Sequence, residues 1–432
     1  MSAYLPAHGD GSYRVTHYDL ALEYRPNPAR LSARAVISAV AGRTLPDIRL
    51  DFGRLRIERV RVDGAPARHV HRDGKLTVRP PRPVAAGDPF VVTVRYAGAP
   101  RPIRSHWGDI GWEELTDGVI VASQPIGAPS WFPCNDRPAD KATYQIAVRA
   151  PSRYTVVANG SLRSRLPDGA MTTWFYEQPV PMSTYLATVQ IGRYASVELA
   201  TEPVPQHASV PQRLLDRFGH DFARQPEMLA VFTRLFGPYP FGDYRVVVVN
   251  DELEVPLEAH GLSIFGTNHV DGRRGSERLV AHELAHQWFG NSVTVAEWRH
   301  IWLHEGFAKY AEWLWSEQSG GEPAAVHAAR SWARVAALPQ DLRVADPGVR
   351  RMFDDRVYER GALTLHALRI ALGDAAFFAL LREWTRTHQN GTVTTEEFEA
   401  MAQRFATRPV DDLFTRWLHE PGLPALPKAA DA

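Results

Sequence analysis

The sequence predicts a protein of two domains, an antiparallel β domain followed by a mixed, mainly helical α+β domain. The chain has 432 residues, which exceeds one ordinary folding unit. From about residue 13 to 195, short alternating apolar and polar segments are cut by Gly, Pro and Asp, which is typical of strands. After Gly192 the apolar residues recur at helical spacing. We therefore expect a β domain over 1–197, a second domain over 198–424 and a flexible tail over 425–432.

The first domain is predicted to be an antiparallel β sandwich or saddle of many strands. In its first strand, Tyr18, Leu20, Leu22 and Tyr24 alternate and so fall on one face. The same pattern, rich in β-branched residues and bounded by turns, recurs in FVVTVRY, ATYQIAVRA, RYTVVANG and TYLATVQIG.

The second domain is predicted to begin with helical sequence and to be largely helical after Ser276. The helical pattern PQRLLDRFGHDFARQPEMLAVFTRLFG stops at Gly237. One strand, YRVVVVN, follows, and then an irregular stretch to residue 275. We expect two helices from about Ser276 and His304, and a later helix whose start is marked by the capping-box spacing of Thr394 and Glu397.

The composition argues against several classes of partner. Lys plus Arg and Asp plus Glu both total 49, with no basic block, so the charge pattern of a nucleic-acid or anionic-membrane binder is missing. The first residues lack the apolar core of a leader peptide, and the longest aliphatic run is only Val246 to Val249. The single cysteine, Cys134, excludes an intramolecular disulfide. We expect a cytoplasmic protein without nucleic-acid or membrane partners, and the sequence leaves its oligomeric state open.

A metal-binding pattern lies in the segment RLVAHELAHQWFGN. On a helix, His282 and His286 project from one face one turn apart, so both imidazoles can reach one ion. Glu305, after eighteen intervening residues, lies in a second predicted helix and can supply a third ligand. This set predicts one catalytic Zn²⁺ per chain, with Glu283 taking a proton from the attacking water. The alternative is a surface helix with two solvated histidines and no metal.

These residues and their surroundings resemble the M1 family of zinc metallopeptidases, the group of aminopeptidase N and leukotriene A4 hydrolase. The resemblance spans nearly the whole chain and includes SWFPCNDRPADKATYQIAV, FGPYPFGDY, HELAHQWFGNSV and WLHEGFA. It implies a peptide substrate and an N-terminal β domain followed by a thermolysin-like catalytic domain. It also implies that Tyr358, in RVYERGALTLHALR, donates a hydrogen bond to the tetrahedral oxyanion. Larger members continue into an immunoglobulin-like module and a helical domain that roofs the cleft, and we expect no roof here.

The chain departs from the family where a free α-amine is recognised. At the usual GxMEN motif it reads Val-Pro-Leu-Glu-Ala, so only Glu258 is kept. A second anchor position is occupied by Ile126, which leaves Gln124 as a weak substitute that accepts a hydrogen bond without adding charge. An aminopeptidase is the leading hypothesis, with an endopeptidase or oligopeptidase that needs no free amine as its rival. A hydrolase of a non-peptide substrate such as an epoxide, and an inactive binding module, also remain open.

Three further groups lie close to Glu305 in the sequence. His300 and His304 precede it, and histidines so placed more often face packing or solvent than support a ligand. Glu312, seven residues later and on nearly the same helix face, is a candidate to support a metal ligand from behind.

Overall fold

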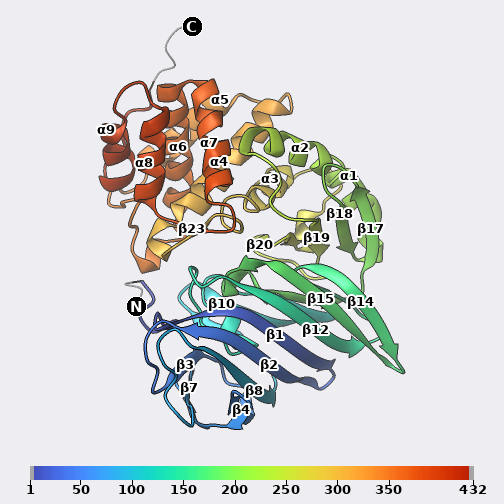
Figure 1. The fold of residues 1–432 in the computed structure, drawn as a ribbon. Coiled ribbons are helices and arrows are strands. Elements are labelled where there is room, and N and C mark those ends of the chain that lie inside the picture. The colour runs from blue at the N-terminus through green and yellow to red at the C-terminus, as the bar shows by residue number, and fades with distance from the viewer. Residues whose placement is uncertain (1–3, 428–432) are drawn as a thin grey trace. The chain divides into compact units, whose positions relative to one another are not determined.

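The computed structural model describes residues 4–427, which group into two compact units (Figure 1). The first unit contains the chain up to Glu198 together with His207–Leu215 and Gly242–Asn268. The second contains Leu199–Gln206, Asp216–Phe241 and the chain from His269 onward. The end of the predicted flexible tail, residues 428–432, lies outside the described residues.

The first unit is built on an eight-stranded sheet (Figure 1). The strands in spatial order are β14 (Ser161–Asp168), β15 (Met171–Met182), β12 (Ala142–Pro151), β1 (Tyr13–Pro26), β2 (Ala29–Ala41), β8 (Pro89–Gly98), β4 (Arg56–Val62) and β5 (Ala65–Pro66). All neighbours pair antiparallel except β1 and β12, which pair parallel. The antiparallel prediction thus needs one correction. The chain between β1 and β12 is long enough to supply the crossover that a parallel pair requires.

Two smaller sheets accompany the large one. One has the order β13 (Thr155–Ala158), β16 (Val189–Gly192), β11 (Gly118–Ala122), β10 (Gly108–Leu115) and β9 (Ile103–Ser105). The other has the order β3 (Ile48–Asp51), β7 (Lys75–Arg79) and β6 (Arg68–Arg72).

The alternation predicted for the first strand is confirmed, because Tyr18, Leu20, Leu22 and Tyr24 are all buried in the shared core. Cys134 is buried too. The segment TYLATVQIG is a strand only in its last four residues, since a 3-10 turn at Thr184–Leu186 precedes β16.

A further mixed sheet contains the one strand predicted after the helical segment. Its order is β17 (Ala195–Ala200), β18 (Gln206–Val210), β19 (Tyr244–Val248), β21 (Leu262–Phe265) and β20 (Leu257–Ala259). The prediction of an irregular stretch to residue 275 was wrong, because β20 and β21 lie in it. They are too short to show a period, and Gly261, at φ 76°, forms the turn between them. Val247 and Ile264 share a core cluster with Ile120, which groups this segment with the first unit.

The second unit is mainly helical. Its helices include α1 (Leu215–Asp221), α2 (Gln225–Phe236), α3 (Glu277–Ala285), α4 (Trp302–Gln318), α5 (Ala324–Ala336), α6 (Asp355–Leu372), α7 (Asp374–Thr387), α8 (Thr395–Phe405) and α9 (Asp411–Phe414). Two short strands, β22 (Thr294–Val295) and β23 (Thr392–Val393), pair parallel. Figure 1 shows α4, α6, α7 and α8 stacked as neighbours.

The predicted helix boundaries hold with small shifts. The first helical segment is divided into α1 and α2, where Pro226 occupies the first turn of α2, a position that tolerates its missing N–H. That helix ends at Gly237 as predicted, with φ 103°. Ser276 is the N-cap of α3, while α4 begins two residues before His304. The capping box of Thr394 and Glu397 is confirmed, with both hydrogen bonds present.

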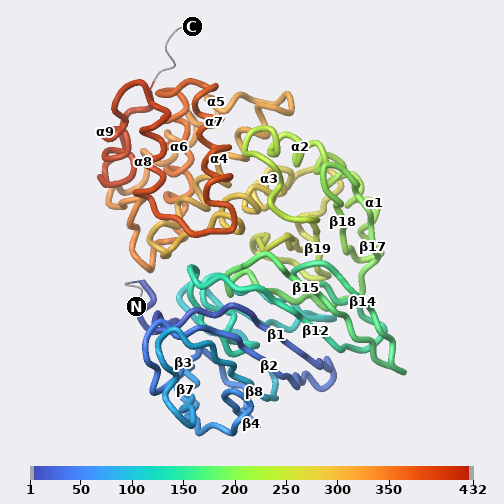
Figure 2. The backbone as a smooth tube through the Cα atoms, in the orientation of Figure 1, coloured from blue at the N-terminus to red at the C-terminus, as the bar shows by residue number. Residues whose placement is uncertain are grey.

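Two glycines let α4 and α6 approach each other closely (Figure 2). A Cβ added to Gly306 would lie 2.8 Å from the Cα atom of Gly361, which is closer than real Cβ contacts. This contact fixes Glu305, directly before Gly306, relative to the first turn of α6. Within residues 4–427, no helix is both long and apolar enough to cross a membrane.

Candidate metal centre and catalytic site

The helix α3 and the turn after it carry both histidines of the predicted site. His282 lies on α3, and His286 follows its last residue with helical backbone angles, φ −56° and ψ −23°. The N–H of His286 donates to the carbonyl of His282 at 3.2 Å, so the helical spacing continues through both residues. Their ring centroids lie 4.8 Å apart. The i, i+4 geometry predicted from the sequence is therefore present.

Glu305 on α4 completes a cluster of three buried ligands. Its Oε2 lies 3.6 Å from Nε2 of His282 and 3.5 Å from Nε2 of His286. All three ligand atoms lie within 4.8 Å of one another. In a tetrahedral zinc site with bonds of about 2.0–2.1 Å, two ligand atoms lie roughly 3.4 Å apart. The cluster therefore fits a zinc ion held by two imidazoles and one carboxylate, the set that leaves a coordination position open.

Hydrogen bonds on the outer side of each imidazole orient these ligands. Nδ1 of His282 donates to Oε1 of Glu312 at 2.9 Å, and Nδ1 of His286 donates to the carbonyl of Phe289 at 3.1 Å. Both Nε2 atoms are thereby kept on the side of Glu305, as metal-binding histidines require. The position predicted for Glu312 is confirmed.

The electrostatics of the cluster also favour a cation. Burial alone would lower the pKa of His282, but its hydrogen bonds to the carboxylates of Glu305 and Glu312 raise it to about 9. Burial would raise the pKa of Glu312, but the hydrogen bond from His282 and the charge of Lys309 lower it to about 2. The pKa of Glu305 is lowered as well, against the effect of burial, by the two histidines. Two ionised buried carboxylates around the imidazoles create a demand for positive charge that a divalent metal satisfies.

Two other predicted residues lie in the same unit. Glu283 is on α3 between the two histidines and is buried. Tyr358 is in the first turn of α6, which begins at the Asp354 N-cap. The Tyr358 ring lies nearly parallel to that of His282, at 18°, with 6.2 Å between centroids. The fold thus brings Tyr358 next to a metal ligand that is distant in the sequence.

The two histidines near Glu305 have structural contacts. Nδ1 of His300 accepts a hydrogen bond from the Thr395 N–H at 3.2 Å. Nε2 of His304 accepts from the Val295 N–H at 2.9 Å. Both side chains are buried, and these bonds place them in the packing around β22 and α8.

In the first unit, the two residues predicted to bind an amine contact each other. Nε2 of Gln124, just after β11, donates to Oε1 of Glu258 in β20 at 2.7 Å. The other end of the Gln124 amide, Oε1, is the acceptor to which a substrate amine could donate. Ile126 is buried and offers no polar atom. The hydrogen bond joins residues 134 positions apart, so no local pattern could have predicted it.

Two cations that the sequence did not point to lie beside the metal cluster. Lys309 lies 3.1 Å and Arg278 lies 3.4 Å from Oε2 of Glu312. The i, i+3 spacing of Lys309 and Glu312 on α4 could have predicted the contact between these two residues.

Both parts of the chain match known domains. Residues 221–417 match the Peptidase family M1 domain, and residues 14–186 match the Peptidase M1 N-terminal domain. An M1 zinc metallopeptidase from Deinococcus radiodurans superimposes with a TM-score of 0.91 and 31% identity, over 100% of this chain and 99% of that chain. The chain belongs to peptidase family M1. M1 peptidases are zinc enzymes, and the cluster of His282, His286 and Glu305 is the candidate site for that ion.

Curated relatives of this M1 chain include longer aminopeptidases. Aminopeptidase M1-B of Oryza sativa subsp. japonica is 27% identical over 335 residues, which is 72% of this chain and 38% of that protein. Endoplasmic reticulum aminopeptidase 1 of Homo sapiens is 27% identical over 358 residues, which is 77% of this chain and 38% of that protein. The chain therefore spans well under half the length of these relatives.

Proposed function

We propose that this M1 chain is a zinc aminopeptidase that releases the N-terminal residue of peptides. The observation that carries the proposal is the spacing of 3.5 Å and 3.6 Å between the Glu305 carboxylate and the two Nε2 atoms, which fits zinc. In this proposal His282, His286 and Glu305 hold one zinc ion per chain.

When bound, zinc polarises the scissile carbonyl and lowers the pKa of its water to about 7. Glu283 takes the proton of the attacking water and delivers it to the leaving amine; it is buried on α3 between the two histidine ligands, and a carboxylate can carry out both proton transfers. Tyr358 donates a hydrogen bond to the oxygen on which negative charge develops. A phenol suits this role because it stays protonated at neutral pH.

For the exopeptidase part of the proposal, Glu258 pairs with the α-ammonium group of the substrate. Gln124 orients the Glu258 carboxylate through its 2.7 Å hydrogen bond and offers its own oxygen to the amine. A similar D. radiodurans chain has been solved with the peptide Tyr-Ser-Ala, and a similar two-domain M1 zinc metallopeptidase has been solved with the free amino acid L-arginine. Ligands of this kind support small peptides as the substrate class.

The rival reading, an endopeptidase or oligopeptidase, is favoured by Ile126. An isoleucine at the second anchor position gives the α-amine neither charge nor hydrogen bond.

The deciding experiment compares free aminoacyl and matching N-acetylated fluorogenic peptides. We expect the free substrates to be hydrolysed, the acetylated ones to resist, and Glu283→Gln to be inactive with zinc still bound. Glu258→Gln should lose most of the preference for the free amine, whereas Glu254→Gln, an exposed neighbour with the same charge change, should keep it. Equal cleavage of blocked and free substrates would favour the endopeptidase reading. Absence of any zinc-dependent peptide hydrolysis would leave a non-peptide substrate or a binding role.

We also propose a domain boundary near residue 198 and a cytoplasmic location. The boundary rests on the change from strand to helix periodicity, and limited proteolysis that cuts elsewhere first would contradict it. The location rests on the single buried cysteine and is tested by cell fractionation.

A further inference from the structure

One face of the eight-stranded sheet carries a row of arginines across three neighbouring strands. Arg95 of β8 pairs directly with Arg34 of β2 on one side and with Arg59 of β4 on the other. Figure 1 shows these strands side by side. Residues directly opposite each other in a sheet point to the same face, with Cβ atoms about 4.5–5.5 Å apart. All three arginines are exposed, so the sheet gathers on its outer face three cations that lie far apart in the sequence.

A fourth arginine joins the row on the same face. Arg61 follows Arg59 at i+2 and pairs with Thr93, which precedes Arg95 by two residues. Nη1 of Arg61 donates to the carbonyl of Gly64 at 3.1 Å. These side chains surround a pocket of about 320 Å³, and none of the described residues that line it is acidic (Arg34, Arg59, Arg61, Gly64, Thr93 and Arg95).

The positive charge of this arginine pocket is largely unmatched by the protein. Nη2 of Arg34 lies 3.1 Å from Oδ2 of Asp19, on β1. Within residues 4–427, neither Arg59 nor Arg95 forms an ion pair or a side-chain hydrogen bond. Four guanidinium groups are therefore accompanied by one carboxylate.

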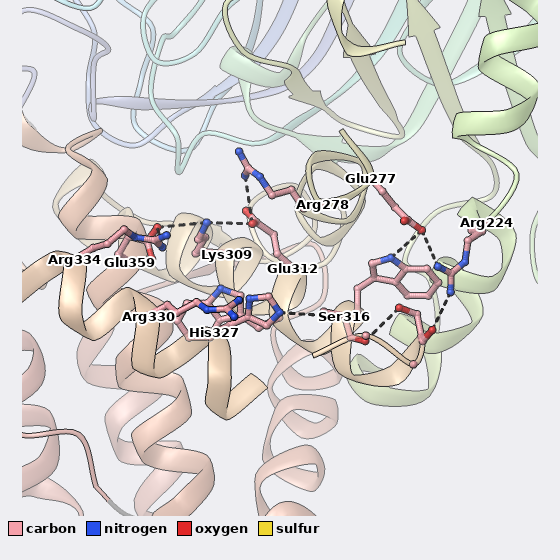
Figure 3. Close-up of a pocket in the computed structure, with 15 residues that line it drawn as sticks. Arg224, Glu277, Arg278, Lys309, Glu312, Ser316, His327, Arg330, Arg334 and Glu359 are labelled. Atoms are coloured by element: carbon pink, nitrogen blue, oxygen red, sulfur yellow. Dashed lines mark hydrogen bonds and ion pairs between the residues drawn. The ribbon is translucent and has the colours of Figure 1, made fainter. Parts of the chain in front are cut away.

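The cations around the larger cavity of the second unit differ in this respect. That cavity measures about 710 Å³, and each cation in its wall forms an ion pair with a carboxylate (Figure 3). The cations concerned are Arg224, Arg278, Lys309, Arg330 and Arg334. They already have protein partners, whereas Arg59 and Arg95 do not.

The register of the arginines favours a ligand with several negative charges. Like charges placed directly opposite each other destabilise a sheet, and Arg95 makes two such contacts, with Arg34 and with Arg59. An anion bound between them offsets this repulsion. Guanidinium groups bind phosphate through paired N–H donors, so a polyphosphate can engage several of them at once.

The dimensions of the row favour a compact anion over a long one. Neighbouring strands lie about 4.8 Å apart, so the row spans roughly 10 Å from β2 to β4. It ends at Ala21 on β1, which pairs with Arg34, and Arg59 lies outside the pairing of β4 with β5. In an extended acidic peptide, side chains on one face lie roughly 6.6–7.2 Å apart, which is wider than the spacing of the arginines.

We propose that the arginine pocket binds a small polyphosphate anion, with the guanidinium groups of Arg34, Arg59 and Arg95 pairing with its phosphate oxygens. Arg61 and the hydroxyl of Thr93 supply further donors beside them. No residue of the metal cluster lines the pocket, so the site is independent of the proposed peptidase activity.

The test titrates inorganic tripolyphosphate into the whole zinc-loaded chain by calorimetry at constant ionic strength. We expect binding about 10-fold tighter than that of orthophosphate, because several arginines are engaged at once. Arg95→Gln, at the centre of the row, and Arg59→Gln should each weaken tripolyphosphate binding about 10-fold. Arg72→Gln, which removes an exposed strand arginine from β6 in another sheet, is the matched control and should bind as wild type does.

Thermal unfolding gives a second readout. Without added polyphosphate and at low salt, Arg95→Gln should unfold at the same or a higher temperature than wild type, because two like-charge contacts are removed. Tripolyphosphate should then raise the midpoint of wild type more than that of Arg95→Gln. Polyphosphate also binds zinc, so the zinc content of each sample is measured, and a difference at equal zinc content comes from the arginine pocket.

Equal tripolyphosphate affinities for wild type, Arg95→Gln and Arg59→Gln would overturn the proposal. A loss of the same size in Arg72→Gln would overturn it too, since the general charge of the surface would then account for binding. A tetraglutamate peptide that binds more tightly than tripolyphosphate, and loses this affinity in Arg95→Gln, would assign the pocket to an acidic protein segment and contradict the polyphosphate assignment.

Discussion

Glu312 links the metal cluster to two neighbouring cations. It accepts from Nδ1 of His282 through Oε1 and contacts Lys309 and Arg278 through Oε2. One carboxylate thus fixes the orientation of a metal ligand and at the same time pairs with two cations. Changing Glu312 should weaken zinc binding, because its hydrogen bond to Nδ1 of His282 orients the Nε2 atom that faces the metal.

We predict that Glu312→Gln weakens zinc binding about 10- to 100-fold, as expected for the loss of an ionised hydrogen-bond partner of a histidine ligand. Competition with a chromophoric chelator measures this affinity directly. Glu383→Gln on α7, paired with exposed Arg386, is the control. Equal zinc affinities for Glu312→Gln and wild type would show that the hydrogen bond to His282 contributes nothing to metal binding.

The substitution Tyr358→Phe removes only the phenolic hydroxyl and so tests its role. If Tyr358 is the oxyanion donor, kcat should fall about 10²- to 10³-fold while zinc content and KM change little, because the hydrogen bond forms only as charge develops. Steady-state kinetics with a metal assay check this. A tyrosine that only packs against the His282 ring would tolerate Phe with nearly full activity.

At the scale of elements, the contact between α4 and α6 sets the position of the site. Glu305 and Tyr358 lie on different helices, and the close approach at Gly306 and Gly361 holds those helices together. Neither helix can move away without displacing a residue assigned to catalysis.

Gly306→Ala should therefore reduce both stability and activity. The new Cβ would lie 2.8 Å from a backbone atom, which cannot shift as a side chain can, so we expect a loss of about 1–3 kcal/mol in the free energy of unfolding. Activity should fall as well because the helix carrying Glu305 is displaced. Gly219→Ala, in α1, meets open space and should be neutral or slightly stabilising. Urea denaturation and zinc content compare the two, and an unchanged Gly306→Ala enzyme would contradict this account of the helix contact.

At the scale of the whole molecule, the second unit carries a buried histidine that makes its stability depend on pH. His366 on α6 lies with Nδ1 3.2 Å from the Tyr310 hydroxyl, and burial lowers its pKa to about 4. An unfolded histidine has a pKa near 6.5, so between these values the unfolded state binds more protons than the folded one. The stability contributed by neutral His366 is present above about pH 6.5 and is lost as the pH falls toward 4.

We expect wild type to lose about 2 kcal/mol more than His366→Gln in its free energy of unfolding between pH 7 and pH 5. Urea denaturation at both pH values measures the difference. His69→Gln, an exposed histidine on β6, should follow wild type. If the free energy of unfolding of wild type and of His366→Gln falls by the same amount between pH 7 and pH 5, His366 is not the acid-sensitive group.

The sequence by itself determined the features that depend only on residues near one another in the chain. The i, i+4 histidines and the Ser276 and Thr394 helix starts depend on neighbours a few residues away, so their spacing was enough. The long strand β1 could be predicted for the same reason, since its alternation extends over many residues. The short strands β20 and β21 could not, because three or four residues carry too little periodicity.

Only the tertiary structure decided which distant residues meet. The hydrogen bond between Gln124 and Glu258, the parallel pairing of β1 with β12, and the placement of the Tyr358 ring beside His282 all join segments far apart in the chain. The contacts of Glu312 with Arg278 and His282 are of the same kind, since they join α4 to α3. Such contacts depend on how whole elements pack, and packing is set by the combined shape and burial of many side chains rather than by any one stretch of sequence.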